Sequence, residues 1–212
     1  MNLFTASSRT NGNSIRYNGL DMCARYTIDI DIETIKEIFA EIERRYPGVV
    51  MSTGEIFPTN VAPIITKDGP APSFWGFKRY DGKGRIINAR SETAEEKHIF
   101  RNAFTNQRCV IPTTGFFEWT KDKHKIKYLF ELPDEQLLYM AGLYDYIDND
   151  LCMVVLTHPA NESVSAVHER MPVILTGDQL MLWLTETDEA RQIIKMASPP
   201  LRKSPATSFS LK

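Results

Sequence analysis

A cysteine that directly follows a methionine, Cys23 after Met22, has the clearest chemical potential in this chain. If the chain began at Cys23, that residue would carry a thiol and an α-amine on adjacent carbons. The α-amine, with a pKa of roughly 7.7 to 8.0, is partly unprotonated near neutral pH, and a thiol near about 8.5 can be activated by a neighbour. Such a 1,2-aminothiol captures aldehydes, because the amine forms a Schiff base and the thiol then closes a thiazolidine ring. The alternative is a small buried residue, the usual place of a free cysteine.

Glu118 lies inside a run of aromatic residues, where a carboxylate is costly unless it is paired or neutral. A strand period of two places Phe117 and Trp119 on one face and Phe116 with Glu118 on the other. A structural ion pair would explain the carboxylate. If Glu118 instead faces a cleft, desolvation would raise its pKa and make it a proton shuttle.

His168 precedes Arg170 and the dipeptide Met171-Pro172, which fixes the loop before an apolar strand. A histidine in such a loop can act as a general acid, although a surface histidine is the commoner finding.

Asn88 and Arg90 alternate with apolar residues and therefore share one strand face. The amide could fix an oxygen-rich ligand, and the guanidinium fork matches phosphate. Other cations could extend a basic track, and aromatic residues could stack on bases there; the alternative is that these aromatic residues are core. The cations are Arg25, Lys78, Arg79, Lys83, Arg85 and Arg170, and the aromatic residues are Trp75, Phe77, Tyr80 and Trp119.

The length of 212 residues, with 42% hydrophobic and 25% charged residues, indicates one ordinary globular domain. No apolar run is long enough for a membrane span. Residues 1–21 are polar, without the apolar core of a secretory signal, so we expect a cytoplasmic protein and a disordered leader.

Three cysteines without Cys-x-x-Cys spacing argue against a disulfide framework and a zinc site, so we expect no metal and no other cofactor. The net charge of −2 gives no global attraction to nucleic acid. Any DNA binding must therefore depend on a local patch.

Many short strands with a few helices predict an α+β domain with a mostly antiparallel, barrel-like β core and peripheral helices. Apolar residues at three- and four-residue steps predict a helix over 32–42, capped by Asp29 or Asp31, and another in which Phe100, Ala103 and Phe104 face the core. The proline-rich stretch 54–63 predicts a rigid loop before a hairpin over 64–77. Further strands are predicted at 108–112, 115–120, 126–132, 137–143 and 152–157, and a last helix at 180–184.

Together these segments resemble the SRAP family, the SOS-response-associated peptidases or abasic-site processing proteins, over residues 22–185. The matching segments are Met22-Cys23 with Arg25, Asn60 to Pro63, Trp75-Gly76, Ile87 to Thr93, Arg108 to Pro112, Gly115 to Trp119, and His168 to Leu175.

The resemblance implies a single α+β domain with a basic cleft that senses abasic sites in single-stranded DNA and crosslinks to their aldehyde through an N-terminal cysteine. By this likeness Cys23 is the nucleophile, Asn88 orients the sugar, Glu118 handles protons in Schiff-base formation and reversal, and His168 protonates the sugar oxygen. Arg25, Arg90 and Arg170 would hold phosphates. Asn60, Pro63, Trp75 and Trp119 complete the implied DNA-contacting set. We expect a monomer that associates with the nucleoid when bound to DNA.

The sequence departs from the family in three places. Ala24 stands where the family has glycine after its cysteine, which narrows the freedom of the backbone. The chain stops at Lys212, before the segment with which the family continues, so either this copy of the domain (22–212) is truncated or a DNA contact is lost. Residues 1–21 precede Met22, so Cys23 as written has no free amine, and we expect either a mis-called start or a propeptide removed before Cys23, by its own peptidase chemistry in the second case.

Two alternatives remain at this point. Cys23, His168 and Glu118 also supply the residue types of a cysteine peptidase acting on other proteins. A plain single-stranded DNA-binding module without hydrolase or lyase chemistry is the other alternative. A peptidase turns over repeatedly, capture is stoichiometric with DNA, and a bare binder gives no complex that survives denaturation.

Overall fold

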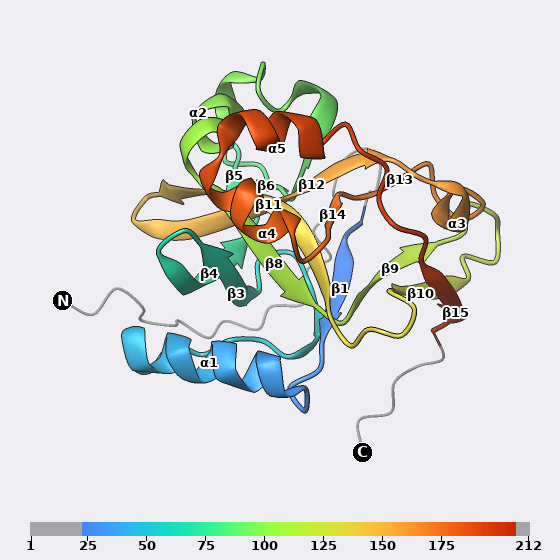
Figure 1. Cartoon of the computed structure of the whole chain (residues 1–212), viewed down its shortest axis with the longest axis horizontal. Helices are drawn as coiled ribbons and strands as arrows, with labels where there is room; N and C mark the ends of the chain where they lie inside the picture. Colours follow the sequence, from blue (N-terminus) through green and yellow to red (C-terminus); the bar gives the residue numbers. More distant parts are fainter. Residues whose placement is uncertain (1–22, 207–212) are drawn as a thin grey trace.

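Five strands close into a barrel in the computed structural model, which describes residues 23–206 (Figure 1). Only the pairing of β12 with β4 is parallel among the five pairings of the ring. Around the ring, β12 (Asp150–Pro159) pairs with β4 (Gly69–Trp75), β4 with β3 (Val61–Thr66), β3 with β8 (Arg108–Thr113), β8 with β11 (Leu138–Ile147), and β11 with β12. Three short strands extend the ring: β14 (Ile174–Leu175) pairs with β11, and β13 (Arg170–Pro172) and β7 (Asn88–Arg90) pair with β12.

Strand β12 is buried on both faces, which explains its continuous apolar sequence. Met153 and Val155 point into one hydrophobic cluster, and Val154 and Leu156 into a second. The second cluster lies under α2 (His98–Asn106), α4 (Gln179–Thr185) and α5 (Thr187–Ile193), which cover the outside of the barrel (Figure 1). The predicted burial of Phe100, Ala103 and Phe104 in the first of these helices is confirmed.

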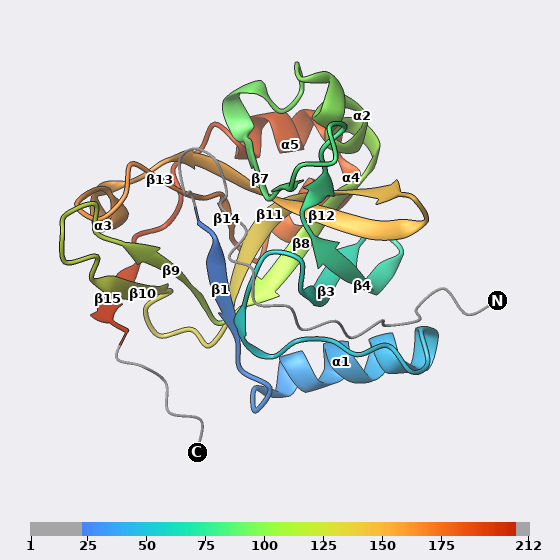
Figure 2. The same ribbon diagram turned by 180° about the vertical axis from the view of Figure 1, so that it is seen from behind.

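A second sheet lies beside the barrel. Its strand order is β15 (Arg202–Pro205), β10 (Lys127–Glu131), β9 (Gly115–Trp119), β1 (Arg25–Ile28) and β2 (Gly54–Ile56), with all four pairings antiparallel. Figure 2 shows β1 between β9 and the barrel strands. The inner face of this sheet, which includes Tyr26, Ile28 and Phe116, packs with residues of the barrel interior in one cluster. β1 therefore joins the two sheets.

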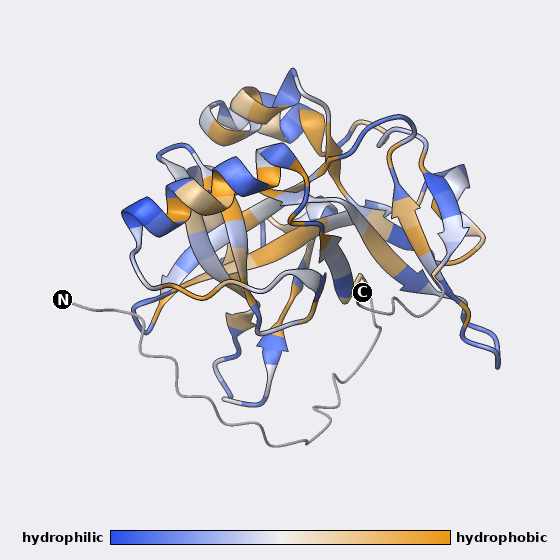
Figure 3. Cartoon of the chain, turned by 90° about the horizontal axis from the view of Figure 1, so that it is seen from below, coloured by the Kyte–Doolittle hydropathy of each residue, from blue (hydrophilic) through white to orange (hydrophobic). Residues whose placement is uncertain are grey.

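Helix α1 (Glu33–Arg45) buries Ile35, Ile38 and Ile42, as the periodicity predicts. Figure 3, seen from below, shows hydrophilic and hydrophobic residues alternating along it. The expected aspartate cap is wrong: the N-cap is Ile32, without a side-chain hydrogen bond, and Asp29 instead accepts the backbone N–H of Asp31.

The proline-rich stretch is a strand in part, contrary to the predicted loop. Residues 54–56 form β2, and β3 begins at Val61, so Pro63 lies opposite Pro72 in the β3–β4 pair. A proline cannot donate to a ladder, but β3 pairs with β8 only at Ile65, and β4 pairs with β12 only at its last two residues. The prolines therefore lie where no further ladder bond is required.

Four short elements complete the described chain. β5 (Phe77–Lys78) and β6 (Arg85–Ile86) form a hairpin, η1 (Ser91–Thr93) is a single 3-10 turn, and Asn161 caps α3 (Glu162–Ser165) by accepting the N–H of Ser163. The predicted α+β class with a barrel-like core is confirmed. Among residues 23–206, no helix is long and apolar enough to span a membrane. The predictions for the leader 1–21 and for the end of the chain from residue 207 lie outside the described residues.

Candidate active site

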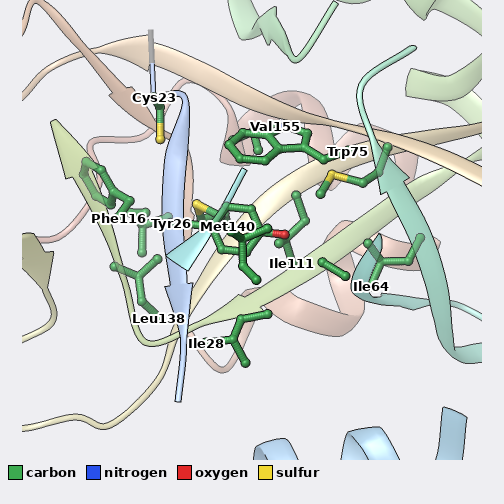
Figure 4. Packing of buried hydrophobic residues seen from close by; sticks show 14 of the residues in the cluster. Cys23, Tyr26, Ile28, Ile64, Trp75, Ile111, Phe116, Leu138, Met140 and Val155 are labelled. Carbon is green, nitrogen blue, oxygen red and sulfur yellow. The ribbon is translucent and has the colours of Figure 1, made fainter. Parts of the chain in front are cut away.

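Cys23 lies at the entrance to β1, where the chain bends. Its φ of 32° falls in the left-handed region, which non-glycine residues seldom adopt. Its side chain is 1% exposed and points into the shared core beside Phe116 and Tyr26 (Figure 4). The thiol is therefore packed as a small apolar group, while the backbone of the same residue faces a carboxylate.

That carboxylate is Glu118 of β9, which is 2% exposed. The backbone nitrogen of Cys23 donates a hydrogen bond to Glu118 Oε1 over 2.6 Å, although the two residues are 95 positions apart. A buried carboxylate needs such a partner, because its desolvation is otherwise costly. The predicted alternation along β9 agrees with the structure, because Lys127 Nζ lies over the rings of both Phe117 and Trp119, 3.9 and 5.4 Å from their centroids.

Glu118 has different effects on the thiol and on the backbone nitrogen of Cys23. Burial, and secondly the charge of Glu118, hold the pKa of the Cys23 thiol well above its usual value. The thiol therefore stays protonated near neutral pH in this arrangement. Glu118 is placed to exchange a proton with the nitrogen of Cys23.

Asn88, on a strand that extends the barrel, also contacts Cys23. Strand β7 runs parallel to β12, and the Asn88 side-chain Nδ2 lies 3.5 Å from the carbonyl oxygen of Cys23. Along β7, Asn88 is half-buried, Ala89 is buried and Arg90 is exposed. The predicted shared face of Asn88 and Arg90 agrees with this alternation.

His168 occupies the loop between α3 and β13 and is 7% exposed. Its Nδ1 lies 3.1 Å from both the backbone nitrogen and the carbonyl oxygen of Arg170. The next residue, Glu169, forms an ion pair with Lys121, just beyond the end of β9, at 3.2 Å. Lys121, and more weakly His168 and Arg90, lower the pKa of the Glu169 carboxyl. The His168 loop therefore lies near the ends of β7 and β9, the strands that carry Asn88 and Glu118.

Arg170 is not an open phosphate site in this structure. The residue is 8% exposed, and its guanidinium donates to both carboxylate oxygens of Glu92, at 2.6 and 2.7 Å. It also donates to the carbonyl oxygen of Thr157 at 2.6 Å. A phosphate would have to displace this network, so the predicted direct contact is corrected to an internal one.

Arg25 and Trp119 lie on the outer face of the second sheet, and both are half-buried. The Arg25 guanidinium lies 4.0 Å from the centroid of the Phe57 ring, and its Nε lies 3.4 Å from Glu55. Lys127 Nζ lies 5.4 Å from the centroid of the Trp119 ring. Cations and partly exposed aromatic rings thus lie together on this face.

Three residues of the expected DNA-contacting set lie in a turn or are buried: Asn60, Pro63 and Trp75. Asn60 Oδ1 accepts the N–H of Phe57, which closes the turn between β2 and β3. Trp75 is fully buried against Tyr26, with ring centroids 4.9 Å apart, and Pro63 is buried in β3. Predicted base stacking on Trp75 is corrected, because no ring surface is exposed.

The predicted basic track is only partly open. Lys78, Arg79, Tyr80 and Arg85 line a cleft of about 590 Å³ beside the β5–β6 hairpin. Lys78 pairs with Asp148 and Asp150, Arg79 pairs with Asp81, and Arg85 donates to a backbone carbonyl. Phe77, expected as a stacking surface, is fully buried.

The sequence reasoning missed Glu92 and Thr157. Glu92 stands two positions after Arg90, which was expected to hold a phosphate. An acid so close to that arginine is the signal that could have indicated an internal ion pair. Thr157 gives no signal in the sequence, because its shortest contact with Arg170 is through the backbone carbonyl at 2.6 Å, while its hydroxyl oxygen lies farther away at 3.4 Å. Within residues 23–206, no cluster of His, Cys, Asp or Glu side chains could hold a metal ion.

Residues 22–209 match the family model described as SOS response associated peptidase (SRAP). The chain belongs to the SRAP family. The chain is 32% identical to the abasic site processing protein YoqW of Bacillus subtilis, over 87% of this chain and 97% of that protein. It is 26% identical to the abasic site processing protein YedK of Escherichia coli, over 89% and 90% of the two chains. An X-ray crystal structure of a Bacteroides thetaiotaomicron protein has the same fold, with a TM-score of 0.74, 24% identity, and coverage of 88% and 93%.

Proposed function

We propose that this SRAP protein captures abasic sites in single-stranded DNA by a covalent bond to Cys23 and shields the damaged strand. The hydrogen bond between the Cys23 nitrogen and Glu118 carries the proposal, because it puts a proton acceptor at the atom that would attack the aldehyde. The names of the relatives, abasic site processing proteins, support the same substrate.

The reaction requires the nitrogen of Cys23 as a free α-amine. Glu118 accepts a proton from the α-ammonium, and the amine adds to the aldehyde carbon of the ring-opened sugar. The resulting hydroxyl leaves as water when Glu118 returns the proton, which gives a protonated imine. The thiol sulfur then bonds to the imine carbon, the C=N electron pair passes to nitrogen, and Glu118 takes the proton of the thiol. The ring closes within one residue, because nitrogen and sulfur belong to adjacent carbons of Cys23.

Asn88 and His168 take supporting roles in this proposal. The Asn88 amide, beside the Cys23 carbonyl, orients the sugar hydroxyls, and His168 gives a proton to the sugar oxygen as the ring opens. Run in reverse, the same proton transfers by Glu118 release the DNA.

Single-stranded DNA would lie across exposed cations and aromatic rings near Cys23. Arg90 is exposed at the end of β7, and Arg25 and Trp119 flank the start of β1 and the end of β9. Guanidinium groups hold phosphates, and a partly exposed indole stacks on a base. Association with the nucleoid follows from this binding.

In the full sequence the Cys23 nitrogen belongs to the Met22–Cys23 peptide bond. We propose that the same Glu118 assists its release. Glu118 takes the proton of the thiol as sulfur attacks the Met22 carbonyl carbon. The C–N bond then breaks as Glu118 delivers that proton to nitrogen, and water hydrolyses the resulting thioester. This self-cleavage uses the peptidase chemistry once and frees the amine.

The test is incubation of the protein with single-stranded DNA containing one abasic site, followed by a denaturing gel. We expect a complex that survives denaturation, at most one protein per site, and its absence with Cys23→Ala. Cys152→Ala is the matched control, since Cys152 is also buried but lies in the other core cluster. Repeated cleavage of added peptides would favour a peptidase. A complex seen only on native gels would favour a plain binding module.

A further inference from the structure

Glu92 belongs to no step described above, yet it binds the side chain of Arg170, the residue whose backbone contacts the His168 ring. It lies in η1, directly after the strand that carries Asn88 and Arg90. Its two carboxylate oxygens accept separate hydrogen bonds from the two terminal nitrogens of Arg170. This bidentate arrangement fixes the plane of the guanidinium as well as its position.

Glu92 remains ionised over the working range of the protein. The hydrogen bonds from Arg170 are the largest influence, and they lower the pKa of Glu92 to about 2. The Glu92 side chain is 45% exposed, whereas that of Arg170 is 9% exposed. The pair therefore joins a solvent-accessible acid to a guanidinium that is enclosed by protein.

Arg170 is held at three places at once. Its guanidinium bonds to Glu92 of η1 and to the Thr157 carbonyl of β12, and its backbone lies in β13, where it pairs with Pro159. The backbone of this fixed residue provides both contacts to the His168 ring. Any shift of Arg170 must therefore shift the partners of Nδ1.

These two backbone contacts serve both protonation states of the imidazole. A neutral ring with its proton on Nε2 can accept the Arg170 N–H at Nδ1, over 3.1 Å. In the imidazolium, Nδ1–H can donate to the Arg170 carbonyl oxygen, which is also 3.1 Å away. Nε2 is thereby left as the nitrogen that gains or loses a proton toward a substrate.

We propose that Glu92 is a positioning residue for His168, acting through Arg170 to fix the ring and its Nε2–H tautomer. The part of this inference that concerns reaction rate rests on the proposed function, because it assumes that His168 transfers a proton during capture. The part that concerns the tautomer stands independently of any reaction.

The first test is the tautomer, measured by ¹⁵N NMR of histidine-labelled full-length protein, with His168→Ala identifying the signal. We expect the neutral His168 ring of the wild type to be the Nε2–H form, and Glu92→Ala to give a mixture of both tautomers. Glu95→Ala is the matched control, because Glu95 also pairs with an arginine, Arg191, at 2.9 Å, away from His168. An unchanged Nε2–H tautomer in Glu92→Ala would overturn the inference, whether or not the protein captures DNA.

The second test is a double-mutant cycle on the crosslinking rate at saturating DNA. We expect Glu92→Ala alone to slow crosslinking by up to roughly 10²-fold, since small misplacements of a reacting group have effects of this size. In the His168→Ala background the same change should have no further effect. An equal slowing in both backgrounds would mean that Glu92 acts elsewhere. Glu92→Gln, which keeps one acceptor for Arg170, should recover part of the rate and guards against a variant that fails to fold.

Discussion

The backbone nitrogen of Cys23 faces Glu118 because the chain bends at Cys23, two residues before β1 begins. The β1–β9 register pairs Arg25 with Phe117, so a straight continuation would put Cys23 opposite Trp119, with its backbone directed along the ladder. The positive φ of Cys23 breaks that continuation, and its nitrogen instead donates to a carboxylate on the inner face. A strained residue at a site of this kind is consistent with a functional role, since strain of this sort persists only where the surroundings fix it.

The first prediction concerns this carboxylate. Glu118→Gln keeps the size of the side chain but removes the proton acceptor, so crosslinking should slow by roughly 10²- to 10⁴-fold if the proton transfer limits the rate. Time courses on denaturing gels with abasic single-stranded DNA measure the change. Glu131→Gln on the neighbouring strand β10 is the matched control and should react as the wild type does. A wild-type rate in Glu118→Gln would remove the carboxylate from the mechanism.

The same substitution should have the opposite effect on the thiol. The charge of Glu118 adds to burial in raising the pKa of the Cys23 thiol, so its removal lowers that pKa and increases the thiolate fraction. Each unit of pKa corresponds to about tenfold in thiolate. Iodoacetamide labelling near neutral pH, quantified for each cysteine by mass spectrometry, should therefore be faster at Cys23 in Glu118→Gln, while Cys109 stays unchanged as the internal reference. Slower or equal labelling would show that the carboxylate does not control the thiol.

The sequence predicts the elements well where one periodicity determines burial. The spacing of Ile35, Ile38 and Ile42 is sufficient for α1, and the alternation around Asn88 places it beside Arg90. The prediction of a loop around Pro63 is wrong for a different reason. A proline is tolerated in β3 where β8 does not pair with it, and the extent of that pairing is a property of the barrel and not of the local sequence.

The roles of charged residues were harder to predict than the elements. Arg90 and Arg170 are the same residue type in similar polar segments, yet one is exposed and the other is enclosed by Glu92 and Thr157. Only the register of β7, β12 and β13 decides which arginine meets an internal acid. The approach of Glu118 to Cys23 likewise depends on a backbone bend that the sequence does not indicate, because the residue with the positive φ is Cys23 and not a glycine.

Arg90 should contribute more to DNA binding than its buried counterpart does. Because Arg90 is exposed, Arg90→Ala should weaken binding to intact single-stranded DNA at low salt and reduce the slope of log affinity against log salt by about 0.7 for one phosphate contact. Fluorescence anisotropy over a salt series measures both quantities. Arg44→Ala, on the far surface of α1, is the control and should leave the slope unchanged. An affinity that does not depend on salt would count against the proposed patch.

The Glu92–Arg170 pair should make stability depend on acid pH. Glu92 has a folded pKa of about 2, below its ordinary value of 4.5, so the stability that it contributes is present above the ordinary value and is lost as pH falls through about 2. Because Glu92 is partly exposed, we expect a contribution of at most about 1 kcal/mol. Urea unfolding between these pH values should show a smaller decrease in Glu92→Gln than in the wild type. Glu96→Gln on the same segment is the control, and a decrease identical in all three proteins would contradict the assignment.

The final prediction concerns the amine, on which the whole capture chemistry depends. The nitrogen that Glu118 contacts is an amide in the full sequence and cannot form an imine until the bond to Met22 is broken. Protein expressed from Met22 should lose its methionine, because aminopeptidase trims before a small residue, and should crosslink; protein expressed from Met1 should crosslink only to the extent that intact mass shows Cys23 at its N-terminus. Cys23→Ser in the shorter form keeps the amine without the thiol, so it should give an adduct that persists only after borohydride reduction. A chain that retains residues 1–22 by mass and still crosslinks as fast as the shorter form would show that the terminal amine is not the reacting group, and the proposed function would then fail.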